Sequence, residues 1–126
     1  MESTLTKVIR TLLGLLLLFA GASKLLGLGA SQVHNEVATA FMKGLVAAGY
    51  MLPLIAVTEI VCGAAFVVGR FVALGAILLA PIAVNIVLFH AVLDPSGGAP
   101  GFFVGIAEIY LLAVSFPKYQ ELLRSE

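Results

Sequence analysis

The residues from Leu52 to Gly69 form an apolar stretch that is long enough to cross a lipid bilayer, and this stretch carries one carboxylate, Glu59, near its middle. An ionised side chain at such a depth costs roughly 3 kcal/mol on insertion scales, so it is rarely left facing lipid. It normally faces the interior of a helix bundle, where a partner receives it. The fold of this chain must therefore bring another polar group to Glu59.

The composition places the chain among membrane proteins. Hydrophobic residues make up 61% of it and charged residues 11%, against about half and about a quarter in a typical soluble domain. Seven Lys and Arg residues balance seven Asp and Glu residues, so there is no basic field for nucleic acid. The single cysteine, Cys62, excludes an intramolecular disulfide, and we expect it to be a small buried hydrophobe. Residues 1–126 are expected to form a single membrane domain.

Four apolar stretches predict transmembrane helices. We expect these helices at about residues 5–27, 52–69, 71–93 and 101–116. Pro81 is expected to bend the third helix. The fourth is short for a bilayer, for which about 20 residues are usual, and Pro117 is expected to end it.

The first apolar stretch has two interpretations. Lys7 and Arg10 precede an uncharged run, and the small residues 20–22 follow it, as in a cleavable signal peptide. Because the apolar character continues beyond those small residues, we expect the stretch to remain as a helix. Lys24 lies close to its far end, where the ammonium group either extends to the membrane interface or reaches down to Glu59.

Residues 33–48 predict a short amphipathic helix that lies along the membrane surface. Apolar residues recur there at every fourth position: Val33, Val37, Phe41 and Leu45. Ser31 or Asn35 is expected to cap the start of this helix, and Gly49 is expected to end it.

Together these elements predict an all-α integral membrane four-helix bundle with a short amphipathic surface helix between the first and second helices. Four crossings place both termini on one side of the membrane. That side collects five basic residues: Lys7, Arg10, Arg70, Lys118 and Arg124. By the positive-inside rule we expect the N- and C-termini in the cytoplasm and the surface helix outside.

Five polar side chains are expected at a similar depth in the outer half of the bundle, while the inner half is expected to be apolar. They are Lys24, Glu59, Asn85, His90 and Glu108. Because two carboxyl groups face one ammonium, we expect Glu59 to be ionised against Lys24, and Glu108 or His90 to carry a proton. The alternative is that these residues only hold the helices together, at about 1 kcal/mol for each contact.

The spacing of residues in these helices resembles the DoxX family of small bacterial membrane proteins, over about residues 6–115. The matching stretches are Arg10-x3-Gly14, Phe19 to Leu25, Glu59-Ile60-x2-Gly63, Gly69-Arg70, Asn85-Ile86-x2-Phe89-His90 and Asp94-Pro95. The resemblance implies a four-helix protein of the bacterial cytoplasmic (inner) membrane, linked in some members to quinone or thiol redox systems. It implies that Lys24, Glu59, Asn85 and His90 carry over as functional positions, while the lone Cys62 speaks against thiol exchange.

Three functions fit these observations. The first is a redox-associated subunit whose polar pocket binds a small ligand, with a quinone as the candidate cofactor. The alternatives are a non-enzymatic scaffold or chaperone-like subunit, acting on a membrane protein partner or as a homo-oligomer, and a proton-coupled carrier of small solutes. We expect no metal site, because His34 and His90 lie in separate segments without the spacing of zinc ligands. The sequence assigns no catalytic residue.

Overall fold

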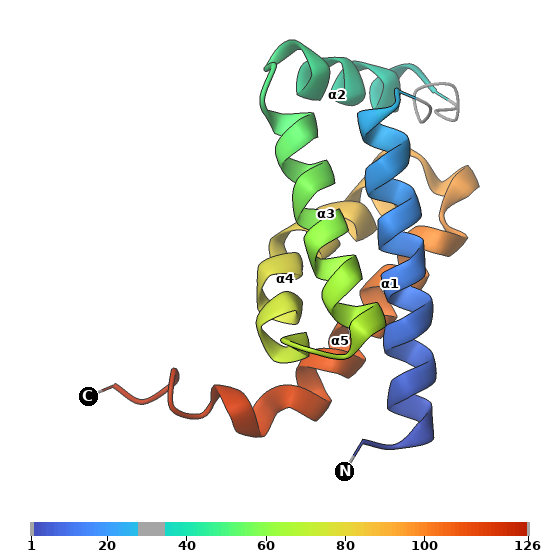
Figure 1. Ribbon diagram of the computed structural model, residues 1–126. Helices are drawn as coiled ribbons and strands as arrows, with labels where there is room; N and C mark the ends of the chain where they lie inside the picture. Colours follow the sequence, from blue (N-terminus) through green and yellow to red (C-terminus); the bar gives the residue numbers. More distant parts are fainter. Residues whose placement is uncertain (1, 28–34, 126) are drawn as a thin grey trace.

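The structure, a computed structural model, describes residues 2–27 and 35–125, and all regular secondary structure within them is helical. Four segments are long and apolar enough to cross a membrane: α1 (Thr4–Leu25), α3 (Met51–Val68), α4 (Val72–Leu88) with its continuation η2 (Phe89–Leu93), and α5 (Ala99–Tyr119). Helix α2 (Glu36–Ala47) lies across one end of the bundle, and both termini lie at the other end (Figure 1). The expected membrane bundle with a surface helix is confirmed.

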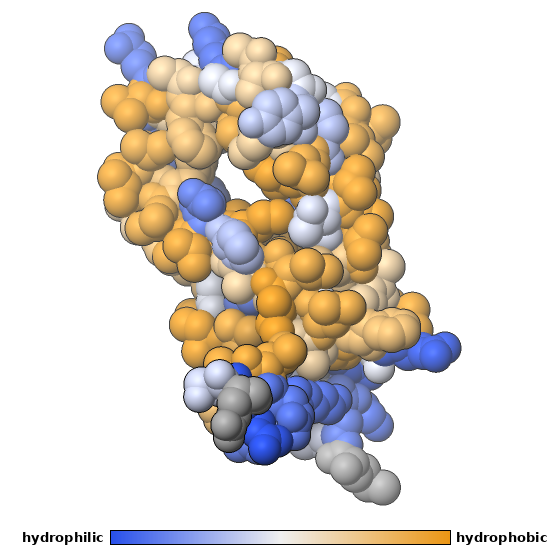
Figure 2. Space-filling model, turned by 90° about the vertical axis from the view of Figure 1, so that its left-hand side faces the viewer, coloured by the Kyte–Doolittle hydropathy of each residue, from blue (hydrophilic) through white to orange (hydrophobic). Residues whose placement is uncertain are grey.

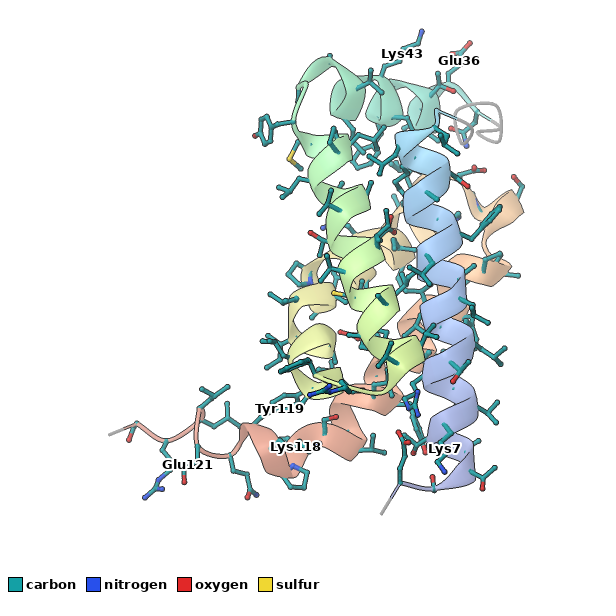
Figure 3. All side chains as sticks on the ribbon, viewed as in Figure 1. Lys7, Glu36, Lys43, Lys118, Tyr119 and Glu121 are labelled. Atoms are coloured by element: carbon teal, nitrogen blue, oxygen red, sulfur yellow. The ribbon has the colours of Figure 1, made fainter. Side chains whose placement is uncertain are left out.

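Charged side chains gather at the two ends of the molecule. Glu36 and Lys43 lie at the end that carries α2, which we call the α2 end (Figure 3). Lys7, Lys118 and Glu121 lie at the opposite end, which we call the terminal end. Between them the outward-facing side chains are mostly hydrocarbon, as a bilayer requires.

Asn35 is the residue that begins α2. Its Oδ1 accepts the backbone N–H of Ala38 at 2.8 Å, while its Nδ2 donates to the carbonyl oxygen of Leu93 and so ties α2 to η2. Residues 31–34, which include the other expected cap and the expected first turn, lie outside the described residues. Gly49 ends the helix region with a φ of +84°, a left-handed conformation that favours glycine.

The spanning helices pack most closely as two pairs, α1 with α3 and α4 with α5. Glycines bring the backbones of α1 and α3 together: a Cβ atom on Gly14 would lie 2.7 Å from the carbonyl oxygen of Gly63. A Cβ atom on Gly21 would likewise lie 2.7 Å from the carbonyl oxygen of Ala56. Such small-residue seams are how membrane helices gain close packing without a hydrophobic driving force.

The pair formed by α4 and α5 packs through two glycines of α5. The imidazole of His90 lies on Gly101, and the side chain of Val87 lies on Gly105, one turn further along α5. The two helices therefore run antiparallel in fixed register from the α2 end.

Helix α5 is longer than the sequence predicted. It runs from Ala99 to Tyr119 with Pro117 inside it, so the expectation that Pro117 ends a short fourth crossing at Phe116 is wrong. The proline lies in the last turn, where it removes only one backbone hydrogen bond. The hydroxyl of Tyr119 then donates to the carbonyl oxygen of Ala73 at 2.7 Å and anchors this last turn on α4. At ~1.5 Å per residue the helix spans roughly 30 Å, enough to cross the hydrocarbon.

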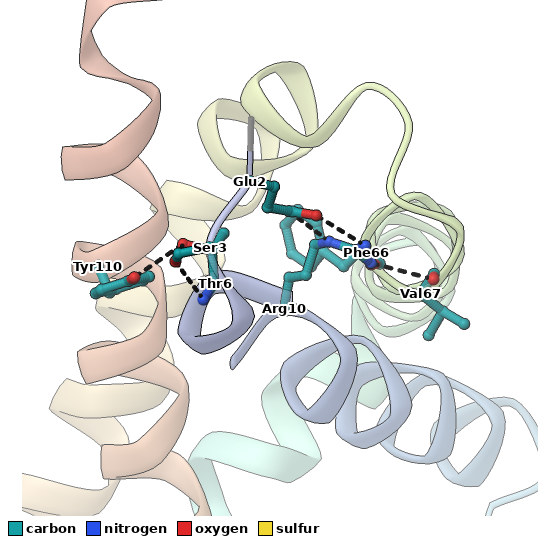
Figure 4. A network of polar contacts seen from close by, with 7 residues as sticks. All are labelled: Glu2, Ser3, Thr6, Arg10, Phe66, Val67 and Tyr110. Carbon is teal, nitrogen blue, oxygen red and sulfur yellow. Dashed lines mark hydrogen bonds and ion pairs between the residues drawn. The ribbon is translucent and has the colours of Figure 1, made fainter. Parts of the chain in front are cut away.

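A polar network joins three helices at the terminal end (Figure 4). The Arg10 guanidinium donates to the carbonyl oxygen of Phe66 at 2.7 Å, in the last turn of α3, where carbonyls lack helical partners. It also pairs with the carboxylate of Glu2 at 2.7 Å. The hydroxyls of Thr6 and Tyr110 are hydrogen-bonded at 2.8 Å and join α1 to α5. The expectation that the inner half of the bundle is apolar is therefore wrong. The sequence alone indicates Arg10 only as a basic residue at the membrane interface and does not reveal its hydrogen bond to α3.

The Glu2–Arg10 pair predicts a pH dependence of stability. The hydrogen bond from Arg10 holds the pKa of Glu2 below its ordinary value. A carboxyl whose pKa falls on folding stabilises the folded state above its unfolded pKa, about 4.3, and this contribution is lost as the pH falls through the lowered value. We expect the free energy of unfolding in micelles to decline over that acidic range, and Glu2→Gln or Arg10→Met to flatten the decline equally. Profiles identical to that of the wild type in both variants would contradict this role of the pair.

Candidate functional site

Lys24 of α1 and Glu59 of α3 form a buried ion pair. The Nζ atom of Lys24 lies 2.9 Å from Oε1 of Glu59, and the exposed fractions of the two side chains are 25% and 1%. Because Gly21 of α1 packs on Ala56 of α3, these two residues lie at the same depth in the bundle. From there Lys24 lies further along α1 toward the α2 end, whereas Glu59 lies further along α3 away from that end. The side chain of Lys24 therefore reaches down into the bundle to Glu59 and does not extend to the membrane interface.

The carboxylate of Glu59 is only partly satisfied by this pairing. Neither of its oxygens has a directed hydrogen bond from the residues that the structure describes, although Oε1 lies in ion-pair contact with the ammonium. One turn further along the same face of α3, Cys62 is buried as expected and its Sγ donates to the carbonyl oxygen of Gly75 at 3.4 Å. Among the residues that the structure describes, the Oε2 atom of Glu59 is thus a buried acceptor without a hydrogen-bond donor.

Glu108 of α5 is the second buried carboxyl group, with an exposed fraction of 3%. Within residues 2–27 and 35–125 neither of its oxygens has a hydrogen-bond partner. It lies two residues before Tyr110, which is tied to Thr6 near the terminal end of α1, whereas Glu59 is tied to the α2 end of that helix. The shared depth of the two acids stays a prediction.

Asn85 and His90 have partners on their own segment. Asn85 is exposed, and its Nδ2 donates to the carbonyl oxygen of Pro81 at 3.0 Å, one turn earlier on α4. His90 is half-buried on η2, a π-helix that the sequence did not predict, and its Nδ1 lies 3.3 Å from the backbone oxygen of Asp94. The buried carboxylate of Asp94 instead accepts from the hydroxyl of Ser96 at 2.9 Å.

The structure thus brings two of the five expected site residues into contact and buries a third without a partner in its described part. The polar contacts of the other two, Asn85 and His90, are with the backbone oxygens of Pro81 on α4 and of Asp94, which follows η2. In the same described ranges there is no group of three or more His, Cys, Asp and Glu side chains that could hold a metal ion. The site offers one ammonium group and two carboxyl groups, which can bind a polar head and hold or move a proton.

An opening passes through the molecule in the half that carries α2, seen from the side on which α3 and α4 lie (Figure 2). Its border is mostly hydrophobic, with a strongly hydrophilic residue beside it. Toward the terminal end the same side is closed, because Phe66 of α3 packs on Gly75 of α4. The two helix pairs therefore meet near the terminal end and separate toward α2.

In the comparison with protein families, the family model described as DoxX matches residues 5–91. The match includes Lys24, Glu59, Asn85 and His90 and ends before Glu108. Comparisons with curated proteins and with solved structures give no match. Because the family model covers more than half of the chain, including both helices that form the buried ion pair, this chain belongs to the DoxX family.

Proposed function

We propose that this DoxX-family protein is a redox-associated membrane subunit that binds a quinone-type ligand between its two helix pairs. The observation that carries the proposal is the buried Lys24–Glu59 ion pair, in which Oε2 of Glu59 has no partner among the described residues. Pockets for such ligands are mostly apolar, with a few polar groups that fix the orientation of the head. A half-buried lysine held by a carboxylate provides such a polar group.

Lys24 is proposed to be the group that meets the ligand. Its side chain is one quarter exposed, whereas Glu59 is almost wholly buried behind it. The ammonium group can donate to a ring oxygen of a quinone while Glu59 keeps it charged and in place. Asn85 and His90 lie within the same family match, and we assign them to the second ring oxygen.

Glu108 is proposed to be the proton carrier. It has no cation beside it in the described part of the structure, so its ionised form would leave an unpaired buried charge. Ser115 and Tyr119, which are also buried, lie about two and three turns further along α5. Ser115 and Tyr119 are proposed to accept the proton beyond Leu111, which is buried between them and Glu108 on the same face.

The proposed location is the bacterial cytoplasmic membrane, with the terminal end in the cytoplasm. Lys7 and Lys118 lie at that end (Figure 3), and basic residues favour the cytoplasmic side. Because a quinone changes its oxidation state only with an electron donor or acceptor, the proposed role requires a redox partner protein.

The test is quinone binding to the protein in nanodiscs. Loss of a hydrogen bond to a charged group contributes roughly 1.5–3 kcal/mol, so Glu59→Gln is expected to weaken binding about tenfold or more. Glu36→Gln, on the exposed surface of α2, is the matched control and should leave the dissociation constant unchanged. Circular dichroism checks that the bundle still folds. Equal affinities for wild type and Glu59→Gln, or no binding to the wild type, would refute the proposal.

A further inference from the structure

We infer that the ligand of this site carries a long apolar tail and reaches the ion pair sideways, from the hydrocarbon of the membrane, through the opening between the helix pairs. The inference rests on the proposed function, because it names what the proposed quinone-type ligand must carry.

The faces that border the opening follow from the contacts below it. Cys62 and Phe66 of α3 both contact Gly75 of α4. Residues three or four positions apart share one face of a helix. Toward α2, the face of α3 that contacts Gly75 therefore continues with Glu59 and Ile55. The facing side of α4 continues with Leu79, Ile82 and Ile86. Leu79, nearest to the contact, is buried, whereas Ile55, Ile82 and Ile86 are partly exposed. Glu59 itself is 1% exposed, so exposure on these faces begins beyond its level, toward α2.

Helix α2 covers the aqueous side of this region. Its Phe41 packs on Phe89 of η2 with ring centroids 5.6 Å apart, and Asn35 donates to the carbonyl oxygen of Leu93. At its other end α2 leads through the turn at Gly49 directly into α3. The opening thus lies beneath a helix that connects the two pairs, and it faces the side of the bundle rather than its end (Figures 1 and 2).

The depth and lining of the opening select the class of ligand. Glu59 lies about 12 Å from the start of α3 at ~1.5 Å per residue, which is within the hydrocarbon of a bilayer. A water-soluble molecule would have to cross hydrocarbon to reach a sideways opening at that depth, whereas a molecule with a lipid-like tail already resides there. The hydrophobic border shown in Figure 2 accepts such a tail, and Lys24 offers a donor to the head.

A single introduced tryptophan can test this route, because the chain contains no tryptophan of its own. Ile86→Trp places the reporter on the face of α4 that continues from the contact with α3 toward α2, at a partly exposed position. Ile106→Trp is the matched control. Because Gly105 of α5 lies against Val87 of α4, positions 86 and 106 lie at the same depth along the bundle. The side chain of Ile106 is 69% exposed. Ile55→Trp, across the opening on α3, repeats the measurement if Ile86→Trp does not fold.

Three quenching probes are added to each variant in nanodiscs: a benzoquinone with a decyl tail, a sulfonated benzoquinone that does not enter lipid, and a brominated decanol without a quinone head. We expect the decyl quinone to give a saturating loss of the Ile86→Trp emission, and only a linear, collisional loss for Ile106→Trp. The sulfonated quinone is expected to give no saturating loss at either position.

The outcomes separate this inference from the proposed function. Saturating quenching of Ile86→Trp by the sulfonated quinone would overturn the sideways route, while quinone binding itself would stand. Saturation by the brominated decanol without saturation by any quinone would support the tail-accepting opening and overturn the quinone role. Linear quenching by all three probes at Ile86→Trp and Ile55→Trp would overturn both.

Discussion

Replacing Lys24 by methionine is expected to reduce the free energy of unfolding by about 3 kcal/mol, since removal of one partner of a buried ion pair typically costs 3–5 kcal/mol. The ammonium group is the only cation in contact with Glu59 in the described part of the chain, at 2.9 Å, and the carboxylate is 1% exposed. Without it, Glu59 either stays charged among apolar side chains or takes up a proton. Reversible unfolding in mixed micelles measures the loss.

Two comparison variants make this expectation specific to the pair. Lys24→Met combined with Glu59→Gln removes both charges, and should recover most of the stability because neutral replacements of buried pairs are often tolerated. Lys43→Met removes an exposed lysine of α2, and should change stability by less than about 0.5 kcal/mol. If Lys24→Met has no larger effect than Lys43→Met, the pair does not stabilise the bundle.

Replacing Gly63 by leucine is expected to separate α1 from α3 and to cost about 3 kcal/mol or more, the upper part of the range for overpacked cores. A Cβ atom at this position would lie 2.8 Å from the carbonyl oxygen of Gly14, and backbone cannot move aside as a flexible side chain can. The same seam sets the level of Lys24 against Glu59, so quinone binding should fall with stability. Thermal unfolding and the nanodisc binding assay measure the two losses.

A glycine without neighbours provides the matched control. Gly44 of α2 has no atom within 4 Å of the position that a Cβ would take. Gly44→Ala should therefore be neutral or stabilise α2 by up to about 1 kcal/mol through its higher helix propensity. A Gly63→Leu variant that unfolds at the wild-type temperature would show that α1 and α3 do not pack through this seam.

Several features of the site could be predicted from sequence because each depends on local chemistry. A charged residue inside an apolar span needs a partner wherever the span goes, so Glu59 and Lys24 could be singled out without a fold. Cys62 could be expected to be buried, since an isolated cysteine in an apolar run behaves as a small hydrophobe. Other contacts depend on how far one helix is displaced along the axis of its neighbour, and this displacement cannot be predicted from the sequence of either helix alone. The tie of Tyr110 to Thr6, which draws the part of α5 that carries Glu108 toward the terminal end of α1, is one of them.

The sequence by itself determined that there are four spans, that a surface helix capped by Ser31 or Asn35 ends near Gly49, and the class of protein, because a bilayer demands continuous apolar length and internally bonded backbone. Only the tertiary structure decided that Lys24 points into the bundle, that Arg10 caps α3 and that α5 continues through Pro117. The first two depend on how closely α1 and α3 approach, and that distance is set by glycine contacts between segments far apart in the chain. The last turn of α5 is instead anchored by the hydrogen bond from Tyr119 to Ala73 of α4.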